Sequence, residues 1–125
     1  INNINMESLK IRNKYISVAA YIKLFLAEYI PNDISRILYL DCDIVICNSI
    51  IDLWNKNLYG KILGAAKSPF FNRHKQLGLS TTSNAFNSGV MIIDLDKWRA
   101  NKIGRKALLF AKNNQDKMKV FYFVY

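Results

Sequence analysis

Short apolar runs recur along the chain and predict the strands of a sheet. Arg36–Leu40, Lys61–Ala66 and Phe86–Ile93 are each brief, apolar and bounded by polar or turn-forming residues, which is typical of strands that lie inside a sheet. We expect Arg36–Leu40 to be buried. The stretch between the second and third runs, Ser68–Ala85, is polar and predicts a long loop that contains His74.

Longer segments with helical character lie before, between and after these runs. Ser17–Tyr29 is rich in helix formers and largely apolar, and Pro31 follows it, so we expect a buried helix there. Ser49–Asp52 resembles a capping box before a short helix. Asp96 can cap a last helix, whose apolar residues recur at about 3.6 positions. Strands that alternate with helices predict an α/β fold with a largely parallel sheet.

Two carboxylates, Asp41 and Asp43, directly follow the strand predicted at Arg36–Leu40. Alternate side chains of a strand share one face, so we expect Asp41 and Asp43 to project together about 6.6 Å apart, at about 3.3 Å per residue, with Cys42 pointing to the other face. Ligands of α/β sheets gather beyond the carboxyl ends of strands. A carboxylate pair at that place suits Mg²⁺ or Mn²⁺ and the phosphate oxygens that such ions bridge.

Composition limits the classes of protein that fit. The 125 residues are 51% hydrophobic, which is enough for one domain with a core and too little for two. The only two cysteines, Cys42 and Cys47, are poorly placed to pair, so we expect free thiols in a reducing compartment. With His74 as the only histidine, a zinc site of the Cys/His kind is not expected. No apolar stretch is long enough to span a membrane and no signal-peptide pattern is visible, which favours the cytoplasm.

The formal net charge is +9, and most of the excess lies between Lys97 and Lys119. Such a segment is either a solvated helix face or a surface for nucleic acid, anionic lipid or a phosphorylated substrate, and charge alone does not decide among these. Aromatic residues spaced for base stacking are not evident in it, which argues against nucleic acid. Peripheral contact with an anionic membrane is the alternative that fits such a segment.

Four segments, taken together and in order, resemble glycosyltransferase family 8: Ile16–Leu24, Ile37–Asp43, Phe86–Leu95 and Trp98–Arg99. The resemblance implies a nucleotide-diphospho-sugar transferase of the GT-A type, with a Rossmann-like, mostly parallel sheet flanked by helices. It implies a retaining, Mn²⁺-dependent (or Mg²⁺-dependent) transfer of a hexose from a UDP-sugar to a saccharide or lipid-linked saccharide acceptor, with lipopolysaccharide or cell-surface glycan synthesis as the setting.

The resemblance also assigns roles to individual residues. Asp41 and Asp43 would bind the metal and the diphosphate, with Cys42 between them at the donor site. Lys23 stands where many members have an arginine, so the charge is kept and the planar fork is lost. Asn87, Ser88 and Gly89 would line the sugar site, where Gly89 permits a close backbone approach. No catalytic residue is assigned, and His74 is interpreted as a surface histidine.

Family members also have an N-terminal strand that cradles the uracil and a C-terminal segment with a metal-binding histidine, and residues 1–125 contain no match to either. We therefore expect a partial, truncated catalytic domain. Two other functions stay open from the residues alone. Asp41 and Asp43 also fit a haloacid-dehalogenase-like phosphatase, with a nucleophile and a general acid/base. The basic segment also fits a noncatalytic binding module.

Overall fold

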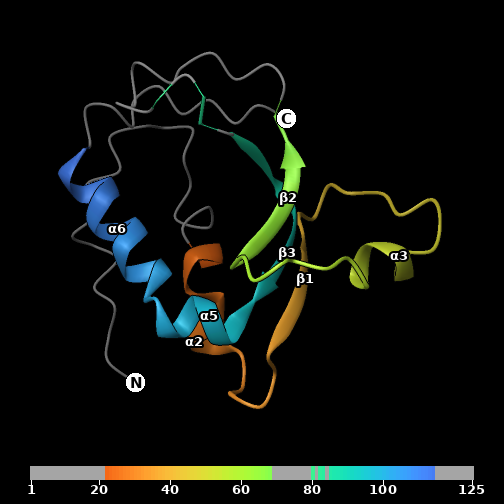
Figure 1. Cartoon of the computed structure of the whole chain (residues 1–125), viewed down its shortest axis with the longest axis horizontal. Coiled ribbons are helices and arrows are strands. Elements are labelled where there is room, and N and C mark those ends of the chain that lie inside the picture. The colour runs from red at the N-terminus through yellow and green to blue at the C-terminus, as the bar shows by residue number, and fades with distance from the viewer. Residues whose placement is uncertain (1–21, 69–79, 81, 84, 115–125) are drawn as a thin grey trace.

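The structure is a computed structural model that describes residues 22–68, 80, 82–83 and 85–114. Its described strands form one sheet in the order β1 (Arg36–Leu40), β3 (Phe86–Asp94), β2 (Leu63–Lys67). Figure 1 shows α2 (Leu26–Tyr29), α5 (Leu95–Ala100) and α6 (Ile103–Asn113) gathered on one side of the sheet, with α3 (Ile51–Trp54) apart from them. An α/β fold is therefore confirmed.

Both described strand pairings are antiparallel. β1 pairs with β3 from Arg36 opposite Asp94 to Leu40 opposite Val90, and β2 pairs with β3 from Leu63 opposite Ile93 onward. The expectation of a largely parallel sheet is therefore wrong for the described strands. The central strand, β3, runs against both neighbours, and an apolar run in the sequence carries no information about strand direction.

The core lies along the central strand. Met91, Ile92 and Ile93 of β3 are at most 4% exposed, and Leu95 and Trp98 of α5 are buried beside them. All five residues of β1 are only half-buried, so the predicted burial of Arg36–Leu40 is wrong. β3 has a strand on each side, whereas β1 has one neighbour within the described part of the sheet.

The first helical segment is described from Ile22 onward. It consists of the 3₁₀ turn η2 (Lys23–Phe25) followed by α2. Phe25 and Ala27 are buried, whereas Tyr29 is exposed, so this part of the predicted helix is buried on one face only. Ser49 accepts a hydrogen bond from the backbone nitrogen of Ile51 at 3.3 Å, at the start of α3.

The last predicted helix is two helices, and its cap is not Asp96. Asp94, which ends β3, accepts a hydrogen bond from the backbone nitrogen of Lys97 at 2.9 Å and is the N-cap of α5. The chain then breaks at Lys102, whose φ of 53° is left-handed, before α6 begins. Asp94 is better placed than Asp96 because the strand's extended backbone continues to it, and an N-cap needs a non-helical backbone.

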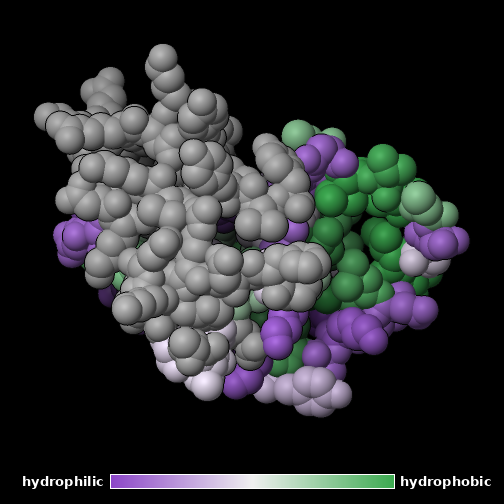
Figure 2. Space-filling view, turned by 90° about the horizontal axis from the view of Figure 1, so that it is seen from above, coloured by the Kyte–Doolittle hydropathy of each residue, from purple (hydrophilic) through white to green (hydrophobic). Residues whose placement is uncertain are grey.

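Apolar side chains are exposed after β1 and along α3, including Val45 at 82% and Ile51 at 63%. Figure 2 shows apolar residues gathered on the side of the molecule that carries α3 in Figure 1. Within the described part of the chain, none of the helices has the length and apolar character that a membrane crossing requires. His74 and most of the predicted loop at Ser68–Ala85 lie outside the described residues.

Candidate functional site

The first carboxylate of the pair follows the end of β1 directly. The strand ends at Leu40, and Asp41 begins a turn in which the backbone nitrogen of Ile44 donates to the carbonyl of Asp41 at 3.2 Å. Asp41 and Asp43 therefore do not share a strand face, and the expected spacing along an extended backbone is wrong. The register of β1 with β3 ends at Leu40 opposite Val90, and the chain turns directly after it. The two carboxylates remain neighbours within one tight turn.

The carboxylate of Asp41 is held by two donors on one of its oxygens. The hydroxyl of Tyr39 donates to Oδ1 at 2.6 Å, and Nζ of Lys23 donates to the same atom at 3.1 Å. The side chain of Asp41 is 34% exposed and that of Lys23 is 13% exposed. The ion pair is therefore shielded from solvent mainly on the lysine side.

The same contacts shift two pKa values in opposite directions. Burial raises the pKa of Asp41, but the hydrogen bonds from Tyr39 and Lys23 outweigh it and leave that pKa below the usual 3.8. Burial and the neighbouring Asp41 carboxylate raise the pKa of Tyr39 to about 12. At neutral pH the pair therefore consists of an ionised acceptor and a protonated donor, which is a charge-assisted hydrogen bond.

Lys23 connects three segments that are far apart in the sequence. Besides Asp41, its ammonium lies 3.4 Å from Oγ and 3.5 Å from the carbonyl oxygen of Ser88. It also lies 4.9 Å from the ring centroid of Tyr39, within the range of a cation–π contact. Lys23, which stands where many family members have an arginine, therefore makes several contacts with a single rotatable ammonium.

The start of β3 forms the other wall of the site. The backbone nitrogen of Asp41 donates to the carbonyl of Gly89 at 2.8 Å, and the backbone nitrogen of Gly89 donates to Oδ1 of Asn87 at 2.7 Å. A Cβ atom at residue 89 would lie 3.0 Å from Oδ1 of Asn87 and 3.2 Å from Oδ2 of Asp41. Gly89 therefore leaves room for the second carboxylate oxygen of Asp41.

Five of the seven sequence-predicted site residues thus come together: Lys23, Asp41, Asn87, Ser88 and Gly89. The remaining two, Cys42 and Asp43, lie in the exposed turn after Asp41. Cys42 is a free thiol, as is Cys47. Asp43 is close enough to Tyr39 for its charge to contribute to the raised tyrosine pKa.

The described residues supply part of a ligand set for a divalent cation. No group of three or more His, Cys, Asp or Glu side chains suited to a metal is found among them. Asp41 and Asp43 are hard oxygen ligands, and no described residue donates a hydrogen bond to Oδ2 of Asp41. Mg²⁺ and Mn²⁺ are commonly bound through one or two carboxylates, with water and substrate phosphates completing the shell. Asp41 and Asp43 are therefore side chains of the chemical type that such an ion takes as ligands.

Tyr39 is the site residue that sequence reasoning missed. The sequence gives one signal for this role. Residues 39 and 41 are two apart, so in a strand their side chains can lie on the same face. A tyrosine in an apolar strand is usually interpreted as core packing, and its ring does contact the core cluster. The hydroxyl, not the ring, reaches the carboxylate.

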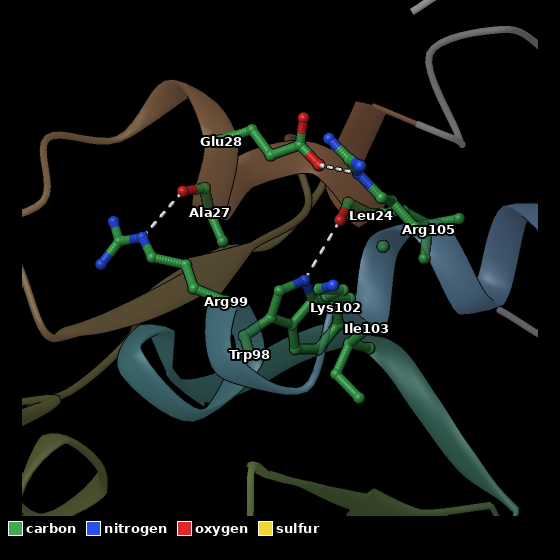
Figure 3. A pocket seen from close by; sticks show the side chains of 9 residues that line it. Leu24, Ala27, Glu28, Trp98, Arg99, Lys102, Ile103 and Arg105 are labelled. Carbon is green, nitrogen blue, oxygen red and sulfur yellow. Dashed lines mark hydrogen bonds and ion pairs between the residues drawn. The ribbon is translucent and has the colours of Figure 1, made fainter.

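Trp98 and Arg99 join the α5 helix to the N-terminal helical segment and do not reach the carboxylates. Nε1 of Trp98 donates to the carbonyl of Leu24 at 3.2 Å, and Nε of Arg99 donates to that of Ala27 at 2.9 Å (Figure 3). These residues border a cavity of about 370 Å³ that Glu28 and Arg105 also line. Their contribution to the site is indirect, because η2 also carries Lys23.

Comparison with known proteins gives a consistent result. The family model described as "Glycosyl transferase family 8" matches residues 2–122. The chain is 30% identical over 114 residues to general stress protein A of Bacillus subtilis, covering 90% of this chain and 40% of that protein. It is 33% identical over 110 residues to a putative glycosyltransferase of Haemophilus influenzae, covering 84% of this chain and 33% of that protein.

A solved structure supports the same relationship. The galactosyltransferase LgtC, in complex with donor and acceptor sugar analogues, superposes with a TM-score of 0.75 at 30% identity, covering 86% of this chain and 40% of that one. The fold is thus of the GT-A type. The chain spans about one third to two fifths of the length of these proteins. The matches favour a glycosyltransferase over the phosphatase and the noncatalytic module.

Proposed function

The chain belongs to glycosyltransferase family 8, and we propose that it acts in the transfer of a hexose from a UDP-sugar to a saccharide acceptor, with retention at the anomeric carbon. The proposal rests on one observation above all. Three segments distant in sequence, η2, the end of β1 and the start of β3, bring together Lys23, the carboxylate of Asp41 and the backbone around Gly89.

In this proposal each residue has a defined task. Asp41 and Asp43 hold the metal that carries the donor's diphosphate. Lys23 keeps Asp41 ionised and in place, and its positive charge adds to the attraction for the diphosphate. Asn87, Ser88 and Gly89 line the sugar pocket, where Gly89 lets a ligand approach the backbone closely. The identity of the hexose depends on residues beyond these, so UDP-glucose and UDP-galactose are both candidates.

The proposed metal is Mn²⁺, with Mg²⁺ as the alternative. When bound, it would supply Lewis-acid neutralisation of the charge that develops on the departing UDP. The chain's own contribution is preorganisation: the Asp41 carboxylate is already oriented by Tyr39 and Lys23, so little reorientation is needed when the ion arrives. Asp43, in the exposed turn, would bind the ion from the solvent side.

Calorimetric titration of UDP into the 125-residue chain, with and without Mn²⁺, tests this function. We expect saturable binding that requires Mn²⁺ and that Asp43→Asn weakens at least tenfold, because removal of a metal-binding carboxylate leaves too few charged ligands. Asp33→Asn is the matched control, because Asp33 is exposed in the turn before β1, and it should bind UDP as the unmodified chain does. UDP binding that is unaffected by Mn²⁺ would contradict the proposal.

The acceptor is proposed to be a saccharide of a lipopolysaccharide or other cell-surface glycan, and the reaction to take place in the cytoplasm. The basic segment would then hold the protein on the inner membrane face. In its described part, Arg105 and Lys106 are exposed on α6 beside Leu109 at 59% and Phe110 at 48% exposure, which suits an anionic lipid surface.

A sedimentation assay with anionic phospholipid vesicles tests the membrane contact. We expect binding that weakens when salt rises from about 0.05 to about 0.5 M, because charge attraction to the lipid is screened. A double substitution, Arg105→Gln with Lys106→Gln, should reduce it. Equal sedimentation with neutral and anionic vesicles would remove the proposal.

A further inference from the structure

The two carboxylate oxygens of Asp41 have different surroundings, because Tyr39 and Lys23 both donate to Oδ1. Resting on the proposed function, we propose that Tyr39 is a positioning residue. Together with Lys23 it occupies Oδ1 of Asp41, so that the divalent metal binds through Oδ2 alone.

The tyrosine is held so that its hydroxyl has little freedom. Tyr39 lies opposite Met91 in the pairing of β1 with β3, and its ring packs against the buried core cluster. The ammonium of Lys23 lies over the ring, 4.9 Å from its centroid. With the ring fixed from two sides, the hydroxyl is directed at the Asp41 carboxylate, where it donates at 2.6 Å.

Oδ1 of Asp41 has no capacity left for a metal. It accepts from Tyr39 at 2.6 Å and from Lys23 at 3.1 Å, and an ionised carboxylate oxygen has about two lone-pair sites. A cation on the same atom would also approach the lysine ammonium closely and be repelled by it.

Oδ2 lies on the opposite side of the carboxylate, over the backbone of Gly89. A Cβ atom at residue 89 would come within 3.2 Å of Oδ2, so the absence of a side chain there leaves room beside this oxygen. In the described part of the chain no hydrogen bond reaches Oδ2. The geometry therefore leaves one oxygen for the metal and fixes its direction toward the start of β3.

This assigns Tyr39 a task that the ring alone cannot perform. Without the hydroxyl, Lys23 is the one described donor on Oδ1, and the carboxylate can rotate about its Cβ–Cγ bond. Binding a metal then costs the entropy of fixing that rotation. Outer-shell hydrogen bonds to metal-binding groups typically change metal affinity by about 10- to 100-fold.

Mn²⁺ titration followed by electron paramagnetic resonance tests the assignment, since the signal of the free aqua ion falls on binding. The variant is Tyr39→Phe, which removes only the hydroxyl and leaves the ring beneath Lys23. The matched control is Tyr29→Phe, because Tyr29 is 68% exposed. We expect Tyr39→Phe to weaken Mn²⁺ binding about tenfold. Its far-UV circular dichroism spectrum and its unfolding midpoint should equal those of Tyr29→Phe.

Equal Mn²⁺ affinity in Tyr39→Phe and Tyr29→Phe would overturn the positioning role while leaving the proposed function intact. Absence of Mn²⁺ binding by the unmodified chain would overturn the metal site itself and this inference with it. The two failures are therefore distinguishable.

A second measurement on the unmodified chain does not depend on the variant folding. Infrared difference spectra with ¹³C-labelled aspartate report carboxylate coordination, and the band from Asp41 is identified by its loss in Asp41→Asn. One-oxygen coordination widens the gap between the antisymmetric and symmetric stretches when Mn²⁺ is added. A narrowed gap, as two-oxygen coordination gives, would overturn the assignment of Oδ2 as the sole ligand atom.

Discussion

Asp41 contacts Gly89 through its backbone nitrogen and lies beside it with its carboxylate. The nitrogen of Asp41 donates to the carbonyl of Gly89 at 2.8 Å, and Oδ2 of Asp41 occupies space 3.2 Å from where a Cβ of residue 89 would lie. Asp41 and Gly89 thus form the last backbone hydrogen bond between β1 and β3, and the proposed metal-binding oxygen of Asp41 lies beside Gly89. Any side chain at residue 89 would push the carboxylate.

We predict that Gly89→Ala weakens Mn²⁺-dependent UDP binding about tenfold and lowers the free energy of unfolding by about 1 kcal/mol or less. To make room for a methyl group, the side chains of Asn87 and Asp41 must move by a few tenths of an ångström. This strain is small, but the movement displaces Oδ2 directly. Calorimetric UDP titration and urea unfolding measure the two effects. Gly64→Ala in β2 is the control: its Cβ would meet the side chain of Leu58, so it should alter stability without altering UDP binding.

Arg99 should be far more important for stability than its position on a surface helix suggests. Its guanidinium donates to four backbone carbonyls, those of Ala27, Ile30, Pro31 and Ile34, at 2.9 to 3.1 Å. Lysine cannot reproduce this fork. We expect Arg99→Lys to lower the free energy of unfolding by about 2 kcal/mol, at about 1 kcal/mol for each of the hydrogen bonds that lysine cannot replace.

Urea unfolding of Arg99→Lys alongside Arg105→Lys checks this expectation. Arg105 is 66% exposed, and its Nε lies 3.9 Å from Glu28, so a lysine there should change stability by no more than about 0.5 kcal/mol. Equal effects of the two substitutions would contradict the role assigned to the guanidinium.

Gly104, at the start of α6, lies against the N-terminal helical segment. A Cβ on it would come within 2.3 Å of the carbonyl oxygen of Leu24, and this neighbour is backbone that cannot rotate away. We expect Gly104→Ala to lower the free energy of unfolding by about 1–3 kcal/mol, the usual cost of overpacking, although alanine is the better helix former. Thermal unfolding measures it, and an unchanged or raised midpoint would refute the close packing of α6 on η2.

Asp94 predicts a pH dependence of stability. The hydrogen bonds that Asp94 accepts from Lys97 lower its pKa below 3.8, so its contribution is complete above that pH and is lost as pH falls through the lower folded pKa. Asp94→Asn keeps an acceptor for the backbone nitrogen of Lys97 and removes the ion pair. We expect this variant to be less stable by up to about 1 kcal/mol at pH 7, and the difference to shrink toward zero as pH falls below 3.8.

Urea unfolding at pH 7 and pH 3 tests this prediction. Lys97→Gln removes the partner of Asp94, so adding Asp94→Asn in that background should have a much smaller effect at pH 7 than in the unmodified chain. A stability difference that stays constant between the two pH values would show that the charge of Asp94 does not contribute.

The sequence predicted the elements better than their arrangement. The strand at Phe86–Ile93 and the described part of the helix expected at Ser17–Tyr29 were located because their apolar residues are continuous or periodic. Strand direction was predicted wrongly because the apolar pattern of β1 and β3 is the same whichever way they run. The cap at Asp94 was missed because two aspartates, 94 and 96, satisfy the same capping rule, and only the end of β3 decides between them.

The site was predicted in the same uneven way. Asp41 was predicted from its place after an apolar strand, Lys23 and Asn87–Gly89 were assigned from a family resemblance, and the structure brings all of them together. The turn that takes Asp43 off the strand face was not predictable, because it depends on where the ladder with β3 stops. Tyr39 was missed because a tyrosine in a strand normally serves the core, and the direction of its hydroxyl is a tertiary property.

Paramagnetic broadening of amide resonances by Mn²⁺ with UDP locates the metal on the chain. We expect selective broadening of the amides of Asp41–Ile44 and Asn87–Gly89, and its loss in Asp41→Asn. Broadening centred elsewhere, for example at Asp94 and Asp96, or unchanged by the Asp41 substitution, would contradict a metal-bound diphosphate at the end of β1.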